Sequence, residues 1–250
     1  MMLKKMETQG RWLFRYRGIL PVIFLLFGAY FYLYTELHPE SFFLEETPYE
    51  IYYEIGCLLI SLLGFAVRVF TVGCTPAGTS GRNTKSGQRA DKLNATGMYS
   101  IVRHPLYLGN FLIWLGIALL TGNAWFIIAF CMLFCIYYER IMFAEEQFLF
   151  NKFGQLYLDW ATKTPAFFPN LKLWIKPGLQ FSWKKILKNE KNGLLAIFLI
   201  FCLFDVLGEW IEGNDDYNIF LLVACMVSIA AFCVLLYLQK RTTLLSEAGR

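Results

Sequence analysis

The chain has 250 residues, of which 57% are apolar and 17% are charged, and its formal net charge is +4. Soluble globular domains carry roughly 25% charged residues, so this composition excludes an ordinary soluble domain and favours an integral membrane protein. The seven cysteines show no spacing typical of a disulfide framework or a zinc site, so we expect no bound metal.

Apolar runs predict the membrane-spanning helices, because a bilayer core of about 30 Å needs about 20 apolar helical residues. In chain order these helices are expected at residues 18–37, 51–71, 105–120, 124–138, 193–207 and 217–239. The third and fourth share one uncharged run, which as a single helix would measure about 50 Å, too long for one crossing. Thr121, Gly122 and Asn123 in its middle favour a turn, so we predict a tight helical hairpin.

The predicted fold is therefore all-α, a polytopic transmembrane bundle of about six helices that forms one domain over residues 1–250. Basic residues gather in the N-terminal segment, in the loop 72–104, in the segment 139–192 and after the last helix. The loops that alternate with them are acidic. Loops rich in Lys and Arg stay in the cytoplasm, so both termini and both large polar segments are expected on the cytoplasmic side.

The first candidate for chemistry is the start of the helix at residue 105. Pro is favoured at the first helical position, which places His104 at the cap and Arg103 just outside it. A helix start offers free N–H groups and a positive dipole end, so these residues make an anion site at the membrane surface. Basic residues at helix ends are also common membrane anchors. Tyr107 and Gly109, where a glycine lets another group approach the backbone, favour the functional interpretation.

The second candidate is a pair of carboxylates, Glu145 and Glu146, at the cytoplasmic end of the fourth helix. Carboxylates are costly against lipid, so they are expected to face a polar cavity or a cationic partner. A solvated helix extension is the alternative. The prolines that follow Trp160 exclude a regular helix there, and this stretch is expected to be either a strip in the headgroup region or a lid over a cofactor.

Together these segments resemble the membrane methyltransferases typified by isoprenylcysteine carboxyl methyltransferase and the bacterial phospholipid N-methyltransferases. The resemblance covers residues 94–170 and includes Gly97-x-Tyr99, Arg103-His104-Pro105-x-Tyr107-x-Gly109, Glu145-Glu146-x-x-Leu149, Phe153-Gly154-x-x-Tyr157 and Pro165-x-Phe167-x-Pro169. It implies a cytoplasmic pocket for S-adenosylmethionine, for which it nominates Tyr99, His104, Tyr107, Leu108, Gly109, Glu145, Glu146, Pro165 and Phe167. The chain departs from the family at Trp160 and Ala166, where Tyr and Arg are frequent, so a cationic contact from Ala166 is lost.

The loop that precedes this region looks like the lipid A 1-phosphate methyltransferases, a bacterial branch of the same family. It implies a lipid phosphate acceptor in the bacterial inner membrane, bound by Thr79, Ser80, Arg82, Asn83 and Lys85. Glycines there let backbone N–H groups surround an anion, while hydroxyls and basic side chains add donors and charge. A flexible basic loop that touches anionic lipid without specificity is the alternative.

An acceptor that is already anionic needs no general base, whereas an amine must first lose a proton. The only other histidine, His38, is predicted on the opposite side of the membrane, which favours an anionic acceptor. Arg103 and Arg82 would then hold its oxygen near the methyl group, and the lipid would enter from the inner leaflet. Isoprenylcysteine carboxyl methylation, phosphatidylethanolamine N-methylation and an NADPH-dependent sterol-type reductase remain alternatives. No nucleic acid partner is expected, and the sequence predicts no oligomeric state.

Overall fold

The computed structural model describes residues 2–44, 47–76, 83–84, 87–88, 90–213 and 216–247. Its helices are α1 (Met2–Arg15), α2 (Ile19–Glu36), α3 (Glu50–Gly73), α4 (Met98–Ile101), α5 (Pro105–Leu120), α6 (Ala124–Phe153), α7 (Gln155–Ala161), α8 (Trp183–Asn189), α9 (Lys191–Glu212) and α10 (Ile219–Arg241). Two 3-10 turns, η1 (Pro39–Ser41) and η2 (Leu171–Leu173), lie between them. The strands β1 (Asn83–Thr84) and β2 (Gly87–Gln88) form a minimal antiparallel pair. The predicted all-α fold is confirmed.

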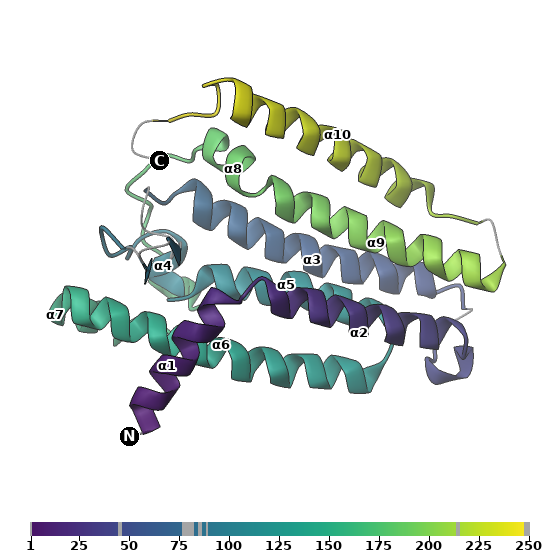
Figure 1. The fold of residues 1–250 in the computed structure, drawn as a ribbon, viewed down its shortest axis with the longest axis horizontal. Helices are drawn as coiled ribbons and strands as arrows, with labels where there is room; N and C mark the ends of the chain where they lie inside the picture. The colour runs from purple at the N-terminus through teal and green to yellow at the C-terminus, as the bar shows by residue number, and fades with distance from the viewer. Residues whose placement is uncertain are drawn as a thin grey trace.

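Four of the described helices, α3, α6, α9 and α10, are long and apolar enough to cross a membrane. The apolar helices α2 and α5 are shorter. The helical hairpin forms as predicted between α5 and α6. Gly122 adopts a φ of 62° in the turn, and the side chain of Asn123 accepts a hydrogen bond from the backbone N–H of Phe126 at the start of α6. The four long helices and the two shorter ones lie side by side and make the elongated bundle seen in Figure 1.

The two arms of the hairpin are short for a membrane crossing, so flanking residues were expected to extend them, and α6 does extend past residue 138. Helix α6 continues to Phe153, because polar residues past Tyr138 keep helical geometry until Gly154 adopts a φ of 55°. The other arm of the hairpin is not extended, since α5 runs only from its cap at His104 to Thr121. Glu145 and Glu146 therefore lie on the α6 extension.

The N-terminal basic segment folds as the amphipathic helix α1, which the apolar runs did not predict. Its buried residues Gly10 and Phe14 face α6. A Cβ at Gly10 would collide with the backbone carbonyl oxygen of Arg140, so α1 crosses α6 at a glycine. Tyr137 on α6 donates a hydrogen bond of 3.0 Å to the carbonyl oxygen of Leu13.

The closest crossing of membrane helices is between α3 and α5. Gly64 on α3 and Gly109 on α5 face each other, and a Cβ on either would meet the backbone of the other helix. Small residues let two membrane helices approach closely. Ser61 adds a hydrogen bond of 2.9 Å to the carbonyl oxygen of Ile113. This crossing fixes the position of α5 against α3, and it therefore also fixes where the first residues of α5 lie.

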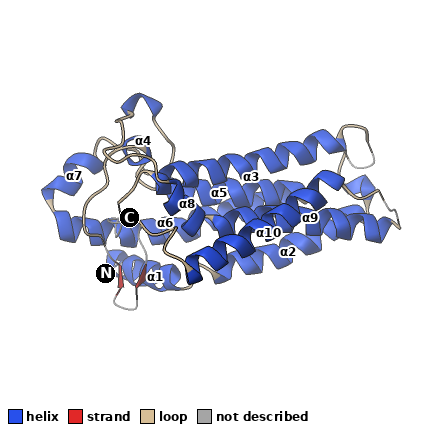
Figure 2. Cartoon of the chain, turned by 90° about the horizontal axis from the view of Figure 1, so that it is seen from above, coloured by secondary structure: helices blue, strands red, loops and turns tan. Residues whose placement is uncertain are grey.

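The polar elements gather at one end of the bundle. Helices α4, α7 and α8 lie there, together with α1 and the end of α10 (Figure 1). The view from above shows the same grouping (Figure 2). The described parts of both termini therefore lie at the same end, as the charge pattern requires.

Candidate functional site

The start of α5 lies at this polar end. His104 is the N-cap residue, and Pro105 is the first helical residue, as the sequence predicted. The backbone N–H of Arg103 donates to the carbonyl oxygen of Pro165 at 2.8 Å, and that of His104 donates to Ala166 at 3.3 Å. The proline-containing stretch after Trp160 is therefore an extended segment bound along the loop that precedes α5.

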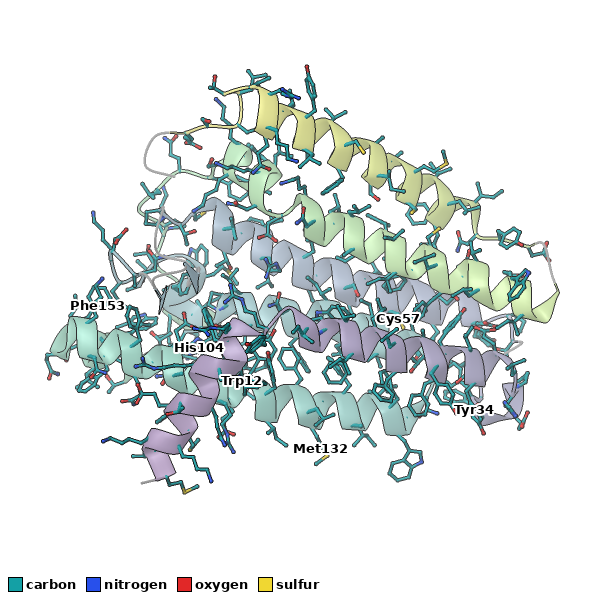
Figure 3. All side chains as sticks on the ribbon, viewed as in Figure 1. Trp12, Tyr34, Cys57, His104, Met132 and Phe153 are labelled. Carbon is teal, nitrogen blue, oxygen red and sulfur yellow. The ribbon has the colours of Figure 1, made fainter. Side chains whose placement is uncertain are left out.

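The carboxylates on the α6 extension meet this helix start. Glu146 lies 2.9 Å from Nε2 of His104 and 3.2 Å from Nη1 of Arg103. The hydroxyl of Tyr107 donates to Glu145 at 2.8 Å. His104 is only 6% exposed, so its contact with Glu146 is shielded from water. The predicted meeting of a basic helix start with an acidic helix end is confirmed, and Figure 3 shows His104 at the polar end of the bundle, far from Tyr34.

A cavity of about 280 Å³ opens beside these contacts. Its lining combines residues that the sequence nominated with residues that it missed: Arg17, Arg68, Val72, Tyr99, Arg103, His104, Pro105, Leu106, Tyr107, Asn110, Glu145, Asn189 and Glu190. Ligand pockets measure about 300–1,000 Å³, so this cavity is near the lower end of that range. Three arginines and two glutamates line it, which makes it able to contact both charges of a zwitterion.

The missed residues that lie outside α5 come mainly from α3 and from the junction of α8 and α9. Arg68 donates through Nε and Nη2 to both carboxylate oxygens of Glu190, at 2.8 and 2.9 Å. Its Nη1 donates to Asn110 at 2.6 Å. A charged residue inside an apolar run, such as Arg68, is a signal of function in membrane helices. No pattern in the sequence indicates that its partner lies 122 residues away.

Several nominated residues support the cavity without lining it. Gly109 packs against α3, and Glu146 holds Arg103 and His104. Pro165 offers its carbonyl oxygen to Arg103, while the ring of Phe167 packs edge-on against Phe111. Leu108 is absent from the described lining. Binding of a cofactor by these residues stays a prediction.

Burial raises the pKa of the Tyr99 phenol above its usual value, and the neighbouring charge of Glu145 raises it further. Tyr99 lines the cavity, so it presents a neutral hydroxyl there at physiological pH. Close by, the buried Nε of Arg103 has no hydrogen-bond partner within the part of the chain that the structure describes. A buried donor of this kind is costly without a partner, and the phenol of Tyr157 lies beside the same guanidinium.

The predicted phosphate-binding loop is described only in part. Thr79, Ser80, Arg82 and Lys85 lie outside the described residues. Asn83 belongs to β1, where it pairs with Gln88. At the start of the loop, the buried amine of Lys185 donates to the carbonyl oxygen and the hydroxyl of Thr75.

Comparison with known proteins places this site inside a family match. Residues 53–156 match the phospholipid methyltransferase family. That segment contains Arg103, His104, Tyr107, Glu145 and Glu146, and it excludes Glu190.

The relatives extend the likeness to isoprenylcysteine methyltransferases. The chain is 32% identical over 117 residues to the protein-S-isoprenylcysteine O-methyltransferase of Saccharomyces cerevisiae, covering 46% of this chain and 48% of that one. It is 33% identical over 85 residues to the enzyme of the same name from Schizosaccharomyces pombe, covering 34% and 36%. The nickel-cobalt-cadmium resistance protein NccN of Alcaligenes xylosoxydans xylosoxydans is 35% identical over 88 residues, covering 35% and 41%. The chain thus spans less than half the length of these relatives. No solved structure matches it.

Proposed function

We propose that this chain is an integral membrane methyltransferase that uses S-adenosylmethionine to methylate a lipid. The observation that carries the proposal is the meeting of Arg103, His104 and Tyr107 with Glu145 and Glu146 beside one cavity. All five residues lie within the segment that matches the phospholipid methyltransferase family.

The residues around the cavity fit this cofactor. S-adenosylmethionine carries a carboxylate, an ammonium group and a sulfonium. Glu145 lies in the lining, where its negative charge complements the two positive groups of the cofactor. Glu146 is outside the lining and holds Arg103. The unpartnered Nε of Arg103 suits the carboxylate, since charge-assisted hydrogen bonds are the strong ones. The neutral hydroxyl of Tyr99 adds a further donor.

The cofactor supplies a methyl group on a positively charged sulfur. The chain's own residues bind and orient the reactants and exclude water from them. His104 is already engaged by Glu146, and His38 contacts the carbonyl oxygen of Tyr34 at the other end of the bundle (Figure 3). Neither histidine is placed to take a proton from an amine, which favours an acceptor that is already anionic.

We propose the 1-phosphate of lipid A as the acceptor, reached from the inner leaflet on the cytoplasmic side of a bacterial inner membrane. The support is the likeness of the loop around Arg82 to that branch of the family, together with the basic charge of the polar end. The carboxylate of an isoprenylated cysteine and the amine of phosphatidylethanolamine are the alternatives. Mass spectrometry of lipids from cells with and without the chain should show lipid A heavier by one methylene. A mass gain confined to phosphatidylethanolamine would reject this acceptor.

The activity itself is tested by calorimetry on the purified protein in detergent micelles. Titration with S-adenosylhomocysteine should give saturable heat, whereas NADPH should give none. Saturable heat with NADPH alone would reject the methyltransferase in favour of a reductase.

A further inference from the structure

The wall formed by Arg68, Asn110 and Glu190 is a part of the cavity that the cofactor contacts do not use. Asn110 is six residues beyond His104 on α5, which is about 9 Å along the helix axis. This wall therefore lies deeper in the bundle than the helix start that faces Glu145 and Glu146. Polar groups at membrane depth are expensive and mark functional sites.

Arg68 retains donors that its partners leave unused. An arginine has five N–H donors, and the three hydrogen bonds from Arg68 go to Glu190 and Asn110. Two donors are therefore without a partner among the described residues. The side chain of Arg68 is 22% exposed, while that of Glu190 is 4% exposed, so the guanidinium is the more accessible member of this pair, although both residues line the cavity.

We infer that Arg68 binds the anionic headgroup oxygen of the lipid acceptor and that Glu190 is the positioning residue that holds the guanidinium in place. The inference rests on the proposed function and adds a second subsite, built by α3, α5 and the α8–α9 junction. The cofactor reaches the polar end from water, whereas a lipid headgroup reaches this deeper wall from the membrane.

The pairing with Glu190 suits the chemistry of the acceptor. A bare arginine would draw charge from a phosphate or carboxylate oxygen and weaken its attack on a methyl group. Glu190 offsets the charge of Arg68 while two N–H groups remain to orient the oxygen. In the transfer, the acceptor oxygen donates an electron pair to the methyl carbon, the carbon–sulfur bond breaks towards sulfur, and no proton moves.

The charge of the acceptor is tested first. Lipids extracted from the membranes of the source cells are separated on an anion-exchange resin, and each fraction is offered to the wild-type protein with radiolabelled S-adenosylmethionine. Label should enter the retained, anionic fraction. Label only in the unretained fraction, or in neither fraction, would overturn the inference. Failure of the wild type to bind S-adenosylhomocysteine would instead reject the proposed function.

Variants then test the two residues. Arg68→Gln should raise the KM for the retained lipid fraction about tenfold or more, since hydrogen bonds to charged groups are the strong ones. The affinity for S-adenosylhomocysteine should stay close to that of wild type. The KM of the Glu190→Asp variant should be closer to the wild-type KM than that of Glu190→Gln, because aspartate keeps the carboxylate. Arg11→Gln, which breaks an exposed arginine–glutamate pair on α1, is the matched control.

Removing one partner of a buried ion pair can prevent folding, so Arg68→Gln/Glu190→Gln is made as well. This double variant leaves no uncompensated charge and should fold, bind S-adenosylhomocysteine and show the raised KM. An unchanged KM would mean that the pair is only structural. An equal loss of S-adenosylhomocysteine binding would assign Arg68 to the cofactor. Either result overturns the inference.

Discussion

Glu146 connects two basic side chains at the start of α5. It contacts both Arg103 and His104. Both contacts depend on the polar part of α6, because Glu146 lies beyond the apolar part of that helix. The sequence predicted that these residue types would meet, because a carboxylate pair at the end of an apolar helix needs a polar partner. It did not predict which carboxylate takes which partner.

Glu146→Gln tests this connection, because it keeps the side-chain shape and removes the charge. Hydrogen bonds to charged groups contribute about 1.5–3 kcal/mol. We therefore expect the affinity for S-adenosylhomocysteine, measured by calorimetry, to fall about tenfold to a hundredfold. Glu139→Gln, at an exposed position of the same helix, is the control and should bind as wild type does. Equal affinities for the Glu146 variant and the control would exclude the role.

Tyr107 makes two separable contacts. Its hydroxyl donates to Glu145, and its ring stacks on His104 with centroids 5.5 Å apart. Tyr107→Phe removes only the hydroxyl, so the fold should remain while the affinity for S-adenosylhomocysteine drops about tenfold. Tyr34→Phe at the other end of the bundle is the control. A Tyr107→Phe protein that binds as tightly as Tyr34→Phe would show that the Glu145 contact is dispensable.

The pair of Arg68 and Glu190 shows what sequence patterns cannot provide. The two residues are separated by 122 positions. Hydropathy identifies each apolar helix but does not specify which faces of two helices meet. The charge of Arg68 inside an apolar run was visible, yet its partner became evident only from the packing of α3 against the start of α9.

At the scale of elements, the crossing of α3 and α5 determines where His104 lies. Gly64→Ala would place a Cβ against the backbone of α5. Overpacking costs about 1–3 kcal/mol, so we expect a lower midpoint of thermal unfolding in detergent. The affinity for S-adenosylhomocysteine should also fall, because α5 carries the cap residue.

Gly56→Ala is the matched control on α3, since a Cβ there meets nothing within 4 Å. It should unfold at the same temperature as wild type or slightly above, because Ala has the higher helix propensity. If both alanine variants unfolded at the same temperature, the close approach of α3 and α5 would not matter for stability.

Helix boundaries were predictable only where hydropathy changes together with helix-breaking residues. The hairpin turn at residues 121–123 was identified because it combines both signals. An extension of α6 was expected from the short apolar arm, but its end at Phe153 was not predicted, because polar residues after Tyr138 continue the helix without a change in backbone geometry. Helix α1 was missed because amphipathic helices at a membrane surface have no continuous apolar run.

The charge pattern and the structure agree that the described parts of both termini lie at one end of the bundle (Figure 1). We expect that end to face the cytoplasm, because the acidic loops lie at the other end. A reporter enzyme that is active only in the cytoplasm should be active when it is fused to the N-terminus and also when it is fused to the C-terminus. Reporters active on opposite sides would contradict an even number of crossings.

We propose that the start of α5 and the carboxylates of α6 hold one cofactor between them. A crystal structure of the protein grown with S-adenosylhomocysteine is the sharpest test. We expect ligand density in the cavity beside His104, Tyr107 and Glu145. Ligand density elsewhere in the molecule, with this cavity filled only by solvent, would contradict it.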